Sequence, residues 1–575
     1  MDPIQQPLCD IATAGRFAGR TPRNSSPPEL YNGVVARHFA RQGDEMRKFN
    51  TTGLCIPRKH YMVSTDERVR QIRAMVDEGD YFCVNRGRQY GKTTTLFALE
   101  GALRDSYDVM SLDFQAISTA GYSTEGKFVA AFCRILWRKR AKLGIPTSVQ
   151  DRVREIAQTG GGEAELDQLF LLLSDWCEES ERPLVLIIDE VDSAANNQVF
   201  LDFLAQLRLQ YLEREKDPDA PAFQSVILAG VTDVRHLRSK IRDEDQHKVN
   251  SPWNIAAPFS VEMGFSPGEI AQMLADYEAD HGTGMEVDAI ARQIFDYTHG
   301  YPFLASRVCQ IVDEGLVGHG FEDLAAAWTE FGVDEAVRRL LSETNTLFDS
   351  LMGKLQNYPE LRSKLRALLM RGEQVAYVSY DNEQQQLLMY GFVRVEHNKL
   401  VIANRVFEML LYVFFVGESE ADPGLRIAAG ADRSAFVAED GGLDVPKIMA
   451  HFIREHNRIH GESGERFLEE EGRERFLTYL SPIINGTGTY SMEGQTRDQR
   501  RMDVVIHWLG RRYVIELKIW RGERYHVEGE RQIAGYLDYF GLRVGYLLSF
   551  DFRGTKRPGV ERIAFGDAVL FEGTV

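Results

Sequence analysis

The sequence predicts an α/β protein that has a parallel sheet in its first half and a second, smaller α/β unit at its C-terminal end. Three continuous apolar segments, YFCVN, LVLIID and SVILAG, alternate with helical patterns between residues 46 and 260. Strands that are apolar along their whole length are covered on both faces, as in a parallel sheet with helices on each side. A chain of 575 residues is too long for one hydrophobic core, so several domains are expected.

Composition and periodicity divide the chain into six stretches. In order they are an N-terminal extension (1–45), the α/β core (46–260), a helical lid (261–340), a winged-helix domain (341–418), a Gly-, Ala- and Asp-rich linker (419–440) and a C-terminal α/β domain (441–575). The winged helix is predicted from helices followed by two short strands around a His-Asn turn. Its second helix, DNEQQQLLMYG, is acidic and polar, which favours a relay between domains over DNA binding.

Bulk properties exclude several classes of protein. A formal net charge of −18 argues against a protein that coats nucleic acid, because such binding depends on Lys and Arg. The six cysteines form no C-x-x-C pair, which argues against a zinc site or a disulfide framework. The segment MDPIQQPLCD is not a signal peptide, and apolar runs such as Met409–Val416 are too short to span a bilayer. We therefore expect a cytoplasmic protein with no membrane segment.

A phosphate-binding loop is predicted where NRGRQYGKTTTL follows a strand and opens a helix. Backbone N–H groups in such a loop converge on phosphate oxygens, and the helix dipole adds to the attraction. Lys92 would reach the β- and γ-phosphates, and the Thr93 hydroxyl would bind Mg²⁺. The loop is irregular, because three residues instead of four separate Gly87 from Gly91; a glycine turn before a core helix is the alternative. The expected contacts to ATP are Arg86, Gly87, Arg88, Gln89, Tyr90, Gly91, Lys92, Thr93 and Thr94.

Two acids at the end of LVLIIDE favour the phosphate-binding interpretation. Carboxylates at the end of a buried strand are costly unless they serve a purpose. Asp189 suits the coordination shell of Mg²⁺, and Glu190 suits the base that orients the attacking water. Thr232, after the third apolar strand, is a candidate sensor of the γ-phosphate. Arg235 and Arg238 are candidate arginine fingers, with a solvated helix face as the favoured alternative for both, and a finger could also come from a second copy in a homo-oligomer. Arg307 is a candidate lid arginine that contacts phosphate.

The strings FNTTGLCIPRKHYMV, YFCVNRGRQYGKTTTL, SLDFQ, LIIDEVD and SPWNIAAPF occur in this order within about residues 49–340. In these strings the chain resembles the bacterial AAA-like ATPases. The resemblance implies a P-loop NTPase fold with a helical lid, and proteins of this kind often bear a C-terminal nuclease-like domain.

The C-terminal unit carries a second group of polar residues. Asp503 lies near the start of one strand, and Glu516 and Lys518 lie on the next. Residues two apart on a strand face the same side, so the carboxylate and the ammonium share a face of an otherwise apolar strand.

This D…ExK arrangement resembles the PD-(D/E)xK nucleases over about residues 445–555. The resemblance implies that Asp503 and Glu516 hold Mg²⁺, or Mn²⁺, and that Lys518 positions the attacking water. It also implies an acid from the first helix, Glu474 or Glu471. Gln532 and Tyr536 resemble the Q-x-x-x-Y helix of nuclease domains in bacterial recombination helicases, and Met502 replaces the Pro that usually precedes the Asp.

The combined expectation is an ATP-binding and ATP-hydrolysing protein that controls a nuclease acting on DNA or RNA, with a setting in defence against foreign nucleic acid by analogy only. Chance occurrence of D…ExK and a catalytically silent fold are the alternatives for the second site. For the whole chain the alternatives are a STAND-type signalling switch whose C-terminal domain binds without cutting, and a nucleic-acid remodelling motor, which the charge makes less favoured.

Overall fold

The computed structural model describes residues 46–160, 164–195, 197–231, 253–370, 375–418, 423–431, 433–460, 469–484, 487–494, 501–519, 533, 537, 541–552 and 557–575. All elements below belong to the compact unit Arg47–Val575. The predicted N-terminal extension, 1–45, lies outside the described residues. No helix among the described residues is long and apolar enough to cross a membrane.

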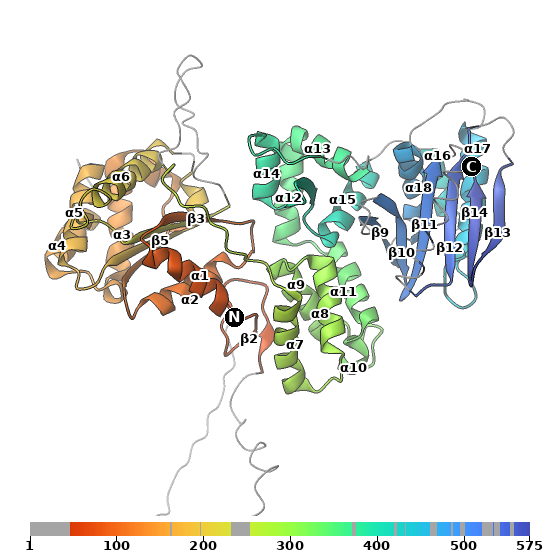
Figure 1. Ribbon diagram of the computed structural model, residues 1–575, viewed down its shortest axis with the longest axis horizontal. Coiled ribbons are helices and arrows are strands. Elements are labelled where there is room, and N and C mark those ends of the chain that lie inside the picture. The colour runs from red at the N-terminus through yellow and green to blue at the C-terminus, as the bar shows by residue number, and fades with distance from the viewer. Residues whose placement is uncertain are drawn as a thin grey trace, which may run out of the picture. The chain divides into compact units, whose positions relative to one another are not determined.

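A four-stranded parallel sheet forms the first domain, as predicted. Its strands lie in the order β3 (Tyr81–Asn85), β6 (Ser225–Gly230), β5 (Leu184–Asp189) and β4 (Asp108–Asp113). Helices α1 (Asp66–Asp77) and α2 (Lys92–Leu103) pack on one face. The other face packs against α3 (Glu125–Leu143), α4 (Thr147–Thr159), α5 (Leu166–Glu179) and α6 (Gln198–Arg214) (Figure 1). Alternate strand residues belong to two separate cores, so the strands are apolar throughout. Helix α4 was not predicted.

The predicted lid is a bundle of helices that begins at a strong cap. Ser266 accepts the N–H of Glu269, whose side chain accepts the N–H of Ser266 in return, and this capping box starts α7 (Pro267–His281). The lid continues with α8 (Val287–Thr298), α9 (Pro302–Gln310), α10 (Leu324–Ala327) and α11 (Glu330–Ser342). Short strands β1 (Lys48–Phe49) and β2 (His60–Tyr61) pair with each other and pack on the lid, where the Phe49 ring stacks 5.2 Å from Tyr277.

Gly300 joins α8 to α9 at a position where only glycine fits. Its φ is +69°, and an added Cβ would lie 1.9 Å from the carbonyl oxygen of Phe265. The N–H of Phe265 donates to the Gly300 carbonyl at 2.7 Å, so the two backbones are in direct contact.

We expect Gly300→Ala to lower the free energy of unfolding by at least ~1–3 kcal/mol, the usual cost of a strained left-handed residue, because the clash adds to the strain. Gly268→Ala in α7 is the matched control: no atom lies within 4 Å of its added Cβ, so it should be neutral or stabilising by about 0.5–1 kcal/mol. Urea unfolding of both variants measures the difference. Equal midpoints would show that the Gly300 contact is unimportant.

The middle segment contains the helices and the hairpin that the sequence suggested. These are α12 (Thr346–Asn357), α13 (Pro359–Met370), α14 (Asn382–Tyr390), strands β7 (Val393–Glu396) and β8 (Lys399–Ile402), and α15 (Arg405–Glu418). The β7–β8 turn places His397 and Asn398 in the left-handed region, as a two-residue hairpin turn requires.

The segment expected as a linker differs from that expectation. Within it, α16 (Pro423–Ala431) packs against the later helix α18 (Glu469–Ile484). Leu425 and Ala429 of α16 are fully buried. The stretch is therefore part of the folded body in its described residues.

The C-terminal domain is built on a six-stranded mixed sheet in the order β13-β14-β12-β11-β10-β9. The strands are β9 (Gly488–Gly494), β10 (Arg501–Trp508), β11 (Arg511–Ile519), β12 (Val544–Phe550), β13 (Gly559–Phe565) and β14 (Ala568–Thr574). β11, β12 and β14 run parallel, and the other pairs are antiparallel. Helix α17 (Val445–His460), which has the predicted bounds, packs against this sheet. The helix expected to carry Gln532 and Tyr536 lies mostly outside the described residues.

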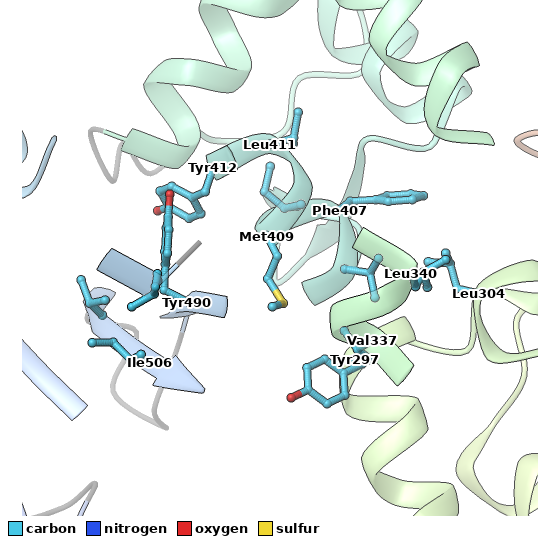
Figure 2. Packing of buried hydrophobic residues seen from close by; sticks show 14 of the residues in the cluster. Tyr297, Leu304, Val337, Leu340, Phe407, Met409, Leu411, Tyr412, Tyr490 and Ile506 are labelled. Carbon is cyan, nitrogen blue, oxygen red and sulfur yellow. The ribbon is translucent and has the colours of Figure 1, made fainter. Parts of the chain in front are cut away.

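The hydrophobic core of this domain is continuous with that of the lid, although the sequence suggested a separate unit. One cluster of buried residues extends from α8, α9 and α11 through α15 to β9 and β10. Figure 2 shows this path, with Tyr297, Leu304, Val337 and Leu340 in the lid, Phe407, Met409, Leu411 and Tyr412 on α15, and Tyr490 and Ile506 in the sheet.

Candidate functional site

The loop between β3 and α2 has the backbone of a phosphate cradle. Gly91 is the N-cap of α2 with φ 79°, and Gln89 is also left-handed with φ 55°. No side chain caps α2, and its own first turn carries no acid. Such an end attracts an anion.

Lys92 lies at the centre of this loop. Its Nζ donates to the carbonyl oxygens of Arg86 and Gly87, each at 2.9 Å, and the side chain is buried. Burial lowers the pKa of Lys92, and the nearby Asp192, Glu190 and Asp189 act in the opposite direction. The ammonium is thus held at the loop by neutral acceptors, which a triphosphate can replace with stronger, charged ones.

The two residues expected to share Mg²⁺ are in direct contact. The Thr93 hydroxyl donates to Asp189 Oδ2 at 2.9 Å, and Asp189 Oδ1 accepts the N–H of Glu190 at 2.9 Å. A hydroxyl and a carboxylate are hard oxygen donors, which is the ligand type that Mg²⁺ prefers. The residues present therefore fit the ion.

Glu190 follows β5 in a left-handed conformation with φ 56°. A non-glycine residue in this region carries strain of about 1–3 kcal/mol, which is typical of functional positions. Burial raises the pKa of Glu190, and the charge of Asp189 raises it further. A half-buried carboxylate with a raised pKa is a stronger base, as activation of water requires.

A cavity of about 750 Å³ opens over the loop, a size that suits a nucleotide. Besides the P-loop it is lined by Glu190 and Asp192 at the end of β5. The segment before α1 contributes Asn50, Thr51 and Cys55, and the middle domain contributes residues of α12 and α14. The hydroxyl of Thr346 on α12 accepts a hydrogen bond from Gln89 Nε2 at 3.2 Å.

Some predicted contacts lie elsewhere. Arg86 is turned away from the cavity: its N–H donates to Gly230 O at 3.3 Å, and its guanidinium donates to Val261 O at 2.8 Å. The Arg86 side chain therefore stabilises the loop from the side opposite the cavity, through its hydrogen bond to Val261. Arg307 is bound to Glu343 by two hydrogen bonds of 3.0 and 2.8 Å. Arg88, Tyr90 and Thr94 line the cavity. Thr232, Arg235 and Arg238 lie outside the described residues.

Sequence reasoning gave no role to several residues of the cavity. Asp192 Oδ2 accepts the N–H of Val231 at 2.7 Å and so fixes the end of β6 beside β5. The string LIIDEVD contains Asp192, so the sequence could have indicated that this acid lies at the cavity. Lys354 and Tyr390 line the cavity from the middle domain. No sequence pattern indicated this position, because only the tertiary fold brings α12 and α14 to the P-loop.

In the C-terminal sheet, Glu516 is completely buried, and its Oε1 lies 2.9 Å from Lys518 Nζ. The predicted sharing of one strand face is therefore present. The pairing of β10 with β11 runs from Trp508 and Arg511 to Val504 and Ile515, and β10 is irregular against β9 between Arg501 and Val504. The side chain of Asp503 lies outside the described part of the structure.

The other expected residues of this site are less well supported. Glu474 is ion-paired with Arg366 of α13 at 2.7 Å, and Glu471 is exposed. Gln532 and Tyr536 lie outside the described residues. Among the described residues no three His, Cys, Asp or Glu side chains are grouped to hold a metal ion.

Comparison with known families decides the identity of the larger part of the chain. The family described as "AAA-like domain" matches residues 58–412. The chain belongs to this family. The AAA-like segment thus includes the sheet, the lid and the middle domain, and it is an AAA-like P-loop ATPase domain, a class that generally binds ATP with Mg²⁺.

Solved structures with a similar arrangement share little sequence with the AAA-like chain. A Walker-type ATPase of Pyrococcus abyssi is 13% identical with a TM-score of 0.44, over 63% of this chain and 99% of that one. RuvB, the Holliday junction branch migration motor of Thermotoga maritima, is 16% identical with a TM-score of 0.31, over 59% and 92%. The ORC2 protein of Aeropyrum pernix is 15% identical with a TM-score of 0.32, over 64% and 98%.

A curated relative is an uncharacterized WD repeat-containing protein of Synechocystis. It is 24% identical over 263 residues, which cover 45% of this chain and 20% of the relative. The AAA-like chain therefore matches about a fifth of the length of that protein.

Proposed function

We propose that the AAA-like ATPase site controls a metal-dependent phosphodiesterase site on β10 and β11 that cuts DNA or RNA. The observation that carries this proposal is the pair Glu516 and Lys518 inside the C-terminal sheet. A carboxylate with no exposed surface is costly to bury, and Glu516 lies with its Oε1 2.9 Å from Lys518 Nζ in the middle of an apolar strand. A buried carboxylate next to an ammonium on one strand face suggests a chemical role.

The position of this pair suits phosphodiester cleavage. Asp503 is the residue before Val504, which pairs with Ile515 next to Glu516. If Asp503 projects toward Glu516, the two carboxylates offer oxygen ligands for Mg²⁺ or Mn²⁺, with Lys518 next to them. The ion would neutralise charge on the scissile phosphate and lower the pKa of a bound water. Lys518 would then orient that water and the phosphate through its ammonium.

A switch of STAND type that binds without cutting is the second candidate. It is favoured by the ion pair between Glu474 and Arg366, which engages an acid that the nuclease interpretation assigns to the metal. Residues of α12 and α14 line the cavity over the P-loop. This arrangement also suits a switch, because the middle domain can then respond to the bound nucleotide.

Cleavage assays with the purified full chain test the proposal. Labelled single-stranded DNA, duplex DNA and RNA are incubated with Mg²⁺ or Mn²⁺, with and without ATP. We expect Glu516→Gln to lower the cleavage rate at least about 10- to 100-fold, the loss typical of disturbing even the outer shell of a metal site. Glu561→Gln, an exposed site on β13, should cleave like wild type.

Three results would contradict the proposal. Cleavage by Glu516→Gln at the wild-type rate would remove β11 from the chemistry. Absence of cleavage by wild type on every substrate would favour the non-cutting switch. Cleavage that is the same with Lys92→Ala as with wild type at saturating ATP would disprove control by the ATPase site.

A further inference from the structure

A buried polar cluster joins the lid to the C-terminal sheet. Asp334 of α11 accepts hydrogen bonds from Tyr297 of α8 at 2.8 Å and from Gln293 at 2.7 Å. From the sheet, His507 of β10 and Arg512 of β11 approach the other carboxylate oxygen of Asp334, with Nδ1 and NH2 at 3.9 and 3.5 Å. Three elements distant in sequence thus converge on one carboxylate.

Arg405, the first residue of α15, completes this junction. Its NH2 lies 3.2 Å from His507 Nε2, and its guanidinium lies over the Tyr297 ring at 5.0 Å. Because arginine can only donate, Nε2 must accept, and the ring proton of His507 is on Nδ1, on the side of Asp334. Burial lowers the pKa of His507 well below its ordinary value, and Arg405 and Arg512 lower it further, so the ring is neutral. The junction therefore has a defined protonation state and hydrogen-bond direction.

The same elements reach the P-loop at their other end. The hydroxyl of Tyr301, between α8 and α9, donates to the carbonyl oxygen of Arg88. The Tyr301 ring contacts the Phe407 ring edge-on, with centroids 5.3 Å apart. Phe407 lies in the first turn of α15, the turn that begins with Arg405. Two buried rings therefore connect the P-loop carbonyl to α15.

The junction also contacts the β10–β11 hairpin, which carries the proposed phosphodiesterase site. His507 and Arg512 are direct strand partners in the β10–β11 hairpin, whose turn at Gly510 rests on the Phe331 ring of α11. Glu516 lies four residues along β11 from Arg512, about 13 Å away at the usual strand rise. A tilt of the hairpin at the junction would therefore move Glu516 relative to the strands around it.

We propose that the junction of Asp334, Arg405, His507 and Arg512 transmits the nucleotide state of the P-loop to the β10–β11 hairpin, and so sets the geometry around Glu516 and Lys518. The link to catalysis rests on the proposed function; the mechanical link does not. Nucleotide binding can change the equilibrium of the hairpin only by the coupling free energy between the two sites. Such coupling energies typically correspond to a change of about 5- to 150-fold in an equilibrium constant.

Hydrogen exchange of the full chain tests this link without any cleavage assay. In wild type, the analogue AMP-PNP with Mg²⁺ should change the exchange rate of backbone amides in 511–517 by about fivefold or more. In Asp334→Asn this response should disappear while AMP-PNP still binds. Asp288→Asn, an exposed change of the same kind on α8, is the control and should respond like wild type.

Arg512→Gln is the second variant. The Arg512 side chain is 29% exposed, so its replacement should destabilise the fold less than a change at the more buried Asp334. It should weaken the response in the same direction. An unchanged exchange rate in wild type despite bound AMP-PNP would overturn the proposal, and so would a full response in both Asp334→Asn and Arg512→Gln. A chain that shows the response but cuts no nucleic acid would contradict the proposed function and leave the junction standing.

Discussion

Glu190→Gln is expected to slow ATP hydrolysis by about 10²- to 10⁴-fold, the range over which a positioned general base contributes. The amide keeps the size of the side chain but cannot take a proton from water. Because Lys92 and the loop N–H groups are unchanged, the Kd for ATP should stay close to that of wild type. Single-turnover hydrolysis and titration with a fluorescent ATP analogue separate the two effects.

The pH dependence of hydrolysis provides an independent check. The ionised form of Glu190 is the active one, so kcat should rise with pH as this carboxyl loses its proton. Burial and Asp189 raise its pKa above the ordinary 4.5, so the acid limb of the profile should lie above that value. Glu190→Gln should lose this limb.

Glu181→Gln is the matched control, because Glu181 is exposed just before the opposite end of β5. It should hydrolyse ATP at the wild-type rate. Hydrolysis by Glu190→Gln within a few-fold of wild type would mean that another group activates the water, and Asp192 would be the next residue to test.

Lys92→Ala is expected to weaken ATP binding by about 10²-fold, since hydrogen bonds to charged groups contribute about 1.5–3 kcal/mol each. The variant should fold, because burial disfavours the charged form of Lys92 even in the native loop. Calorimetric titration measures the affinity. The rise in melting temperature that ATP causes should disappear at concentrations that saturate wild type.

Lys127→Ala, an exposed change on α3, should retain the wild-type affinity and melting shift. Wild-type affinity in Lys92→Ala would exclude the P-loop as the triphosphate site. A lowered melting temperature of Lys92→Ala without ATP would instead indicate that its bonds to Arg86 and Gly87 carbonyls stabilise the loop.

Local patterns predicted the elements that depend on local physics. The apolar strands of the first sheet and the bounds of α17 follow from strong periodicity. The additional strands β9, β13 and β14 were not predicted, because half-buried strands carry a weaker pattern. The helix α16 was mistaken for a linker because the Gly and Asp residues of the 419–440 stretch disfavour a helix, and packing of Leu425 and Ala429 overrides that preference.

The residues of the candidate sites also fall into two groups: those that a local motif predicts and those that depend on the tertiary fold. The P-loop, Asp189 and Glu190 could be predicted to lie together because a few adjacent residues carry each motif, and the structure places them at one cavity. Arg86 was assigned to phosphate from its place in the motif, whereas its side chain bonds to Val261. The pairing of Glu474 with Arg366, which is 108 positions away, depends on the tertiary fold, and no spacing in the sequence reveals it.

The shared core of lid, α15 and C-terminal sheet changes where this chain can be divided. A cut in the 419–440 stretch, the obvious place by composition, would leave Tyr412 on one fragment and Tyr490 and Ile506 on the other, each with a newly wetted apolar face. The sheet domain with the P-loop has its own two cores. The lid therefore shares its core with the C-terminal sheet, and Phe49 and Tyr61, which precede the first sheet in the chain, belong to that same core.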